Sequence, residues 1–153
     1  MKKRSRYRPT PIRFDVMAFV QAGLRPLAAT GQLSTLQIKN HDALASLALG
    51  CATRTDMDKL VAAANMAESL AWLGFGKNWS AGIKAGEDAV KAVSERGAAA
   101  SHWVATGLEL AALRELMNIH DAQLEIATVQ QIEKAMDHIK EVERNKRARK
   151  IAA

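Results

Sequence analysis

Helix start and stop signals recur along the chain from Asn40 onward, and they leave little room for strands. Asn40 is a plausible N-cap, because its side chain can accept a hydrogen bond from a free backbone N–H group of the first helical turn. Thr55 is followed by two aspartates in the next turn, where the helix dipole favours acids. Together the signals predict helices over residues 40–49, 55–73 and 78–95, with stops at Gly50, Gly74 and Gly97.

Two capping boxes predict the starts of two further helices. Thr106 with Glu109 forms the first box and Thr128 with Gln131 the second. The second box follows the preceding helix with almost no linker. We therefore expect a sharp antiparallel corner there, and not one continuous rod.

The N-terminal region combines an extended arm, a short helix and a connection. Pro9 and Pro11 bias the residues before them away from the helical conformation, so residues 1–13 are expected to form an extended basic arm. A short helix can begin after Phe14, with Asp15 near its N-terminus. Residues 32–38 partly alternate in hydrophobicity, and we interpret them as an extended connection because a single strand has nothing to pair with.

These elements predict the fold class: all-α, a single compact helical bundle of about five main helices. Alanine is the commonest residue and only seven of the 153 residues are aromatic, so helix axes can approach closely. The last helix carries one apolar stripe, which must pack on something: Val129, Ile132, Met136, Ile139 and Val142. The predicted organisation is a basic arm (1–13), a helical domain (14–143) and a basic tail (144–153), which projects beyond the core as a solvated helix end or a frayed tail.

Charge is segregated between the ends and the middle of the chain. Residues 1–13 contain six Lys or Arg side chains and no acid, and residues 144–153 contain five and no acid. Residues 14–143 contain eleven basic and sixteen acidic side chains, a net charge of −5. The overall charge of +6 therefore belongs to the ends, and the body taken alone is acidic.

No metal or cofactor signature supports an enzyme, and we predict a non-enzymatic protein with no cofactor. A di-iron bundle needs Glu-x-x-His motifs, and the nearest approach is Glu115 with Asn118 in the position of the histidine. An antiparallel corner between the last two helices could bring together four residues, His120, Asp121, Asp137 and His138. We favour the alternative that one histidine is packed and the others are solvated, because no metal-binding spacing is present.

Motifs for nucleophilic catalysis and for DNA reading are also weak. Cys51 lies in an apolar stretch and is interpreted as a small buried hydrophobic residue. The segment GFGKNWS lacks the P-loop spacing and is interpreted as a glycine-rich corner that Phe75 and Trp79 anchor. Residues 42–70 resemble a helix-turn-helix, but Asp56 and Asp58 stand where a recognition helix would meet phosphates, which favours an ordinary helical hairpin.

The two cationic ends are the strongest functional signal. Dense cations with little acid bind nucleic acid without sequence preference, because each neutralised phosphate releases counterions. The alternative is that the ends keep the protein soluble or contact an acidic partner. The candidate nucleic-acid-binding residues are Lys2, Lys3, Arg4, Arg6, Tyr7, Arg8, Arg13, Arg144, Lys146, Arg147, Arg149 and Lys150.

Three stretches carry a resemblance to a known group: YRPTPIRFDVMAFV, KNHDALASLALGCATRTDMDKLVAAANMAESLAWLG and HDAQLEIATVQQIEKAM. Together they are similar to small uncharacterised helical proteins of tailed bacteriophages and prophages of proteobacteria. The resemblance implies an accessory protein made in the bacterial host cytoplasm. It assigns no functional residue.

The leading hypothesis is a phage or prophage accessory protein, a small regulator that binds nucleic acid or a nucleoprotein complex through its basic ends. The alternative is a protein-binding module that modulates a host protein as an inhibitor or adaptor. We expect no membrane association, because no window approaches the roughly 18–20 uninterrupted apolar residues of a membrane span. We also expect a homodimer or higher oligomer, with the apolar stripe of the last helix, Trp72, Trp79 and Trp103 as the surplus apolar surface.

Overall fold

Six α-helices and two short 3-10 turns make up the computed structural model, which describes residues 15–151 and the side chains of 15–146. No strand occurs within this described part of the chain. The six helices are the short α1 and five longer ones, so the count of about five main helices holds only when the short first helix is set apart. In chain order the elements are α1 (Val16–Gly23), η1 (Leu27–Thr30), α2 (Gln32–Ala48), α3 (Arg54–Trp72), η2 (Lys77–Trp79), α4 (Ser80–Ala100), α5 (Gly107–Ile126) and α6 (Val129–Ile151).

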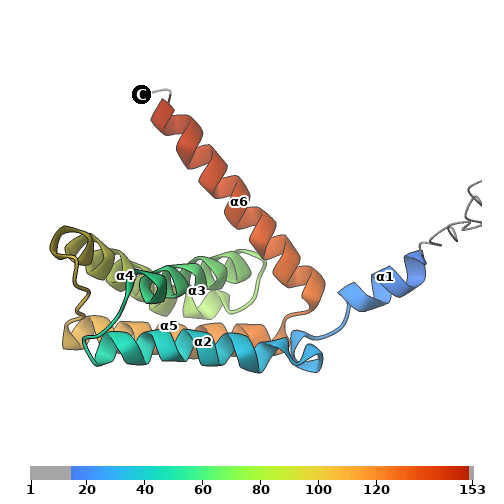
Figure 1. The fold of residues 1–153 in the computed structure, drawn as a ribbon. Helices are drawn as coiled ribbons and strands as arrows, with labels where there is room; N and C mark the ends of the chain where they lie inside the picture. Colours follow the sequence, from blue (N-terminus) through green and yellow to red (C-terminus); the bar gives the residue numbers. More distant parts are fainter. Residues whose placement is uncertain (1–14, 152–153) are drawn as a thin grey trace, which may run out of the picture.

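Helices α2 to α5 form the body, in which α2 and α5 lie side by side and α3 and α4 lie over them (Figure 1). Their core combines leucines with many alanines, and the small side chains allow close approach of the helix axes. The closest example is Gly86 of α4, where an added Cβ would lie 2.5 Å from the Cβ of Leu116 on α5. The predicted alanine-rich helical packing is confirmed in this part of the molecule.

A second apolar cluster joins the body to η1 and α6. Leu70 of α3 and Leu124 of α5 are completely buried there, together with Ala127 at the α5–α6 corner and Ala135 of α6. Helix α6 packs on α3 through this cluster and then extends away from the body (Figure 1). Of its apolar stripe, Ile132 packs against this cluster, whereas Val129, Ile139 and Val142 are half-buried and Met136 is exposed.

Local hydrogen bonds confirm both predicted capping boxes. The Thr106 hydroxyl accepts from the backbone N–H of Glu109, and the Glu109 carboxylate accepts from the Thr106 N–H at 2.8 Å. Thr128 and Gln131 make the same reciprocal pair, so α6 starts anew after a corner, but it then packs on α3 and does not lie antiparallel along α5 (Figure 1). Asp15 also caps α1, as its position near the start of that helix predicted.

The prediction for residues 32–38 was wrong, because α2 begins at Gln32. Gly31 adopts a left-handed conformation (φ 71°) and ends η1, so a new helix can begin directly after it. Leu33 then continues the helical spacing of the buried residues Leu44 and Leu47. Asn40 is consequently not an N-cap and lies buried in the middle of α2.

Two further helix boundaries differ from the prediction. The N-cap of α3 is Thr53 and not Thr55, because Thr53 forms a capping box with Asp56. Gly97 does not close α4 and instead lies inside it, where an added Cβ would lie 2.0 Å from the indole of Trp103. The helix tolerates this glycine because its missing side chain makes room for the tryptophan.

Other predictions for single residues had mixed outcomes. Cys51 is exposed and not buried, because it lies in the connection between α2 and α3. Phe75 anchors the glycine-rich corner against the second cluster, whereas Trp79 is partly exposed. No helix in the described residues is long and apolar enough to cross a membrane.

Candidate functional site

The predicted nucleic-acid-binding residues fall into three groups in the structure. Seven of them lie outside the described residues: Lys2, Lys3, Arg4, Arg6, Tyr7, Arg8 and Arg13. Three lie on the described backbone of α6, which is helical through Ile151: Arg147, Arg149 and Lys150. Arg144 and Lys146 also have described side chains, and both are exposed on α6.

Helix α6 changes in charge along its length. Its middle part contains acids that neighbouring cations partly neutralise, such as Asp137, which accepts a hydrogen bond from Lys140 at 2.9 Å. Glu143 is the last acid of the chain. Among the described residues neither Arg144 nor Lys146 forms an ion pair, so these two cations are available to an anionic partner.

The structure does not bring His120, Asp121, Asp137 and His138 together as one site. His120 is 1% exposed in the body, and burial lowers its pKa to about 4, so its imidazole is neutral at pH 7. Asp121 instead accepts from His41 of α2 at 2.7 Å. One histidine is thus packed, as the favoured alternative predicted, but His138 is half-buried and not simply solvated.

His138 has a separate environment between α6 and α3. Its Nδ1 lies 3.2 Å from the hydroxyl of Ser69, and its ring stacks on Trp72 with 4.1 Å between ring centroids. Trp72 remains 64% exposed on the outer side of this stack. No group of three or more His, Cys, Asp or Glu side chains in the described part of the chain could hold a metal ion.

At the N-terminus of α3 a carboxylate of the helix itself takes the position that a phosphate would need. The Asp56 carboxylate accepts from the Thr53 N–H at 3.0 Å and from Lys59 at 2.9 Å. These hydrogen bonds lower the pKa of Asp56 to about 2, and the bond from the Thr53 backbone has the largest effect. A permanently ionised carboxylate at this helix start supports the interpretation of α2 and α3 as an ordinary hairpin.

A groove of about 460 Å³ between α3, α4 and the end of α6 contains a pair of carboxyl groups that the sequence did not reveal. Glu87 of α4 hydrogen-bonds with Glu68 of α3. Burial first, and then the negative charge of Glu68, raise the pKa of Glu87 to about 7. Lys84, Lys91 and Lys146 also line this groove, which therefore holds mixed charges and one carboxyl group that can exchange a proton near neutral pH.

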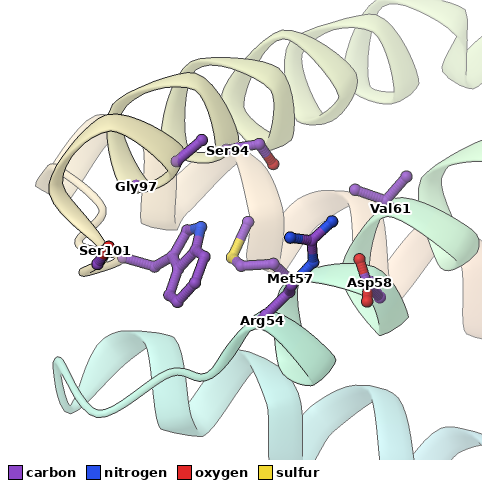
Figure 2. Close-up of a pocket in the computed structure, with 9 residues that line it drawn as sticks. Arg54, Met57, Asp58, Val61, Ser94, Gly97 and Ser101 are labelled. Carbon is purple, nitrogen blue, oxygen red and sulfur yellow. The ribbon is translucent and has the colours of Figure 1, made fainter.

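A smaller pocket of about 290 Å³ lies between the start of α3 and the end of α4 (Figure 2). Met57, Val61 and Trp103 supply apolar walls, and Arg54 and Asp58 supply charges. Ser101, the C-cap of α4, also lines the pocket and adopts a left-handed conformation (φ 54°). This pocket has the mixed lining of a shallow surface depression, and we assign no ligand to it.

Comparisons with known proteins do not add to these observations: the chain matches no family model, no curated protein and no solved structure.

Proposed function

We propose that this protein binds nucleic acid, or a nucleoprotein complex, through its basic ends. The observation that carries the proposal is the change of charge along α6. After Glu143 the helix contains five cations and no acid, and Arg144 and Lys146 are exposed on it. Among the described residues Arg144 and Lys146 form no ion pair, and helix cations of this kind can contact phosphates and release counterions.

The acidic body supports the same proposal by restricting where a polyanion can bind. Residues 14–143 carry a net charge of −5, so phosphates are repelled from most of the body surface. Binding is then confined to the ends and depends little on base sequence. The resemblance to small phage and prophage proteins leads us to propose the host cytoplasm as the setting and a non-enzymatic regulator as the role.

The test measures binding of the full chain to labelled duplex DNA and RNA by fluorescence anisotropy across a salt series. The R144Q/K146Q variant removes two cations of α6, and the K84Q/K91Q variant removes two cations of the body that pair with Asp88 and Glu95. If each lost cation removes one phosphate contact, the slope of log affinity against log salt becomes shallower by about 0.9 per cation for the α6 variant only. Equal slopes for the two variants, or no binding at about 50 mM salt, would contradict the proposal.

A second candidate function is a protein-binding module, which one specific observation favours. Trp72 is 64% exposed but held flat against His138, and rigid exposed tryptophans dominate the energy of many protein interfaces. Affinity purification from the native host, with and without nuclease, separates the two functions. Partners lost on nuclease treatment support nucleic acid, whereas partners retained with the full chain and lost with W72A support the protein-binding module.

A further inference from the structure

Helix α1 presents an apolar face to solvent. None of its residues is buried, and Val16, Met17, Val20 and the adjacent Leu24 are between 45% and 64% exposed. At about 100° per residue these four side chains share one face of the helix. A contiguous apolar face of this kind marks an interaction site in a folded protein.

Residues 25–27 fix the direction in which α1 leaves the body. The Leu27 N–H donates to the carbonyl oxygen of Ala127 at 2.9 Å, and the Val129 N–H donates to that of Arg25 at 3.0 Å. This two-bond bridge attaches the base of α1 to the corner between α5 and α6. Figure 1 shows α1 extending from that point away from the body.

An apolar groove of about 500 Å³ lies beside the same anchor. Leu27 of η1, Leu36 of α2 and Ile132 of α6 supply its apolar surface. The α2 residues that line it run from Gln32 to Lys39, about 10 Å of helix, and the eight residues of α1 are about 12 Å long. Groove and helix therefore match in length and in chemistry.

We propose that two copies of this chain exchange their α1 helices, so that each α1 lies in the groove of the other copy. The bridge at residues 25–27 directs α1 away from its own groove, and a two-fold partner supplies an equivalent groove in its place. The exchange covers two helices and two grooves at once. This adds to the buried area, of which a specific dimer needs roughly 800 Å² per partner. The proposal locates the expected oligomer contact at α1, not on the α6 stripe, and does not rest on nucleic-acid binding.

The first test is the mass of the full chain by light scattering over a concentration series. We expect twice the 16.6 kDa of one chain for the wild type. The M17D/V20D variant should be monomeric, with a dissociation constant raised about hundredfold or more, because each dimer would bury four carboxylates. The matched control L49D/L108D places the same two charges on two exposed leucines, at the C-cap of α2 and in the first turn of α5, and should remain dimeric. Circular dichroism checks that helix content is unchanged in both variants.

The second test identifies the occupant of the groove by disulfide cross-linking in a C51S background. A mixture of the V20C protein and the L36C protein should give a covalent dimer with one copy of each. A V20C/L36C chain that closes within itself at monomer mass would assign the groove to its own α1 and overturn the proposal. A wild type that stays monomeric, or a monomer that binds anionic lipid vesicles through α1, overturns it as well.

Discussion

The body of α2–α5 and the outlying helix α1 contain the same kinds of apolar residue, but the body buries these side chains and α1 exposes them. In the body Leu113 of α5 is 0% exposed, because it lies in the core that α2 to α5 share. In α1 both valines are exposed, because among the described elements this helix packs mainly against the start of α6. An apolar residue stabilises the folded chain only where a second surface meets it.

The body and the exposed part of α6 differ in their polar groups. The body buries Gln123, whose side-chain NH₂ donates to the backbone oxygens of Ala67 and Phe75 at 3.0 and 2.9 Å. This amide ties α5 to the end of α3 and to the corner that follows it. The exposed part of α6 carries surface ion pairs such as Lys140 with Asp137, which contribute little to stability.

The largest expected effect is on the free energy of unfolding, and it distinguishes the body from α1. L113A removes a completely buried side chain and should lower the free energy of unfolding by about 3 kcal/mol. V20A truncates an exposed side chain of α1 and should change it by less than about 0.5 kcal/mol. Urea denaturation of the two variants, at a concentration where each is monomeric, measures the difference. Equal losses would show that α1 packs on its own body after all.

The close packing of α4 on α5 gives the next largest effect. In G86A the new Cβ would meet Leu116 at 2.5 Å, so the helices must separate, and we expect a loss of about 2 kcal/mol despite the better helix propensity of alanine. Gly107 has no atom within 4 Å of an added Cβ, which makes G107A the matched control. Thermal unfolding should show a lower midpoint for G86A alone. A G86A protein as stable as the wild type would mean that the helices do not pack so closely.

Much of the fold was predictable because its signals are local in sequence. The capping boxes at Thr106 and Thr128 depend on residues three positions apart, so both helix starts could be read from the sequence. The same holds for Asp15 at the start of α1. The all-α class followed from many such signals together.

The remaining features depend on contacts between distant residues. Gly97 looks like a helix stop in the sequence, and only the indole of Trp103 explains why it lies inside α4. Glu68 and Glu87 belong to different helices with no shared motif, and packing alone makes them neighbours. For the candidate interface, the sequence identified Arg144 and Lys146 by charge, but not their freedom from ion pairs within the described residues.

A smaller effect tests an ion pair that belongs to the body. The Arg96 guanidinium beside Glu109, and then the Thr106 N–H, lower the pKa of Glu109 to about 2. A lowered pKa stabilises the fold above the ordinary value of about 4.5, and that stability is lost as the pH falls toward 2. E109Q should therefore lose roughly 0.5–1 kcal/mol at pH 7, a value reduced by solvent screening, and nothing near pH 2. Denaturation at several pH values checks this, with E95Q as a surface control that should be nearly neutral throughout.

The smallest expected effect concerns the groove in which the body meets the end of α6. Burial, together with the charge of Glu68, raises the pKa of Glu87 to about 7. A raised carboxyl pKa stabilises the fold only while the group is protonated, so stability should fall as the pH rises from about 4.5 to about 7. E87Q mimics the protonated form, and at pH 8 it should be more stable than the wild type by at most about 1 kcal/mol after solvent screening, with no difference below pH 4.5. E68Q removes the neighbouring charge and should lower the Glu87 pKa, which a carbon NMR titration of the Glu87 carboxyl group measures in both backgrounds. A Glu87 that titrates near 4.5 in the wild type would show that water reaches this carboxyl group and that neither burial nor Glu68 raises its pKa.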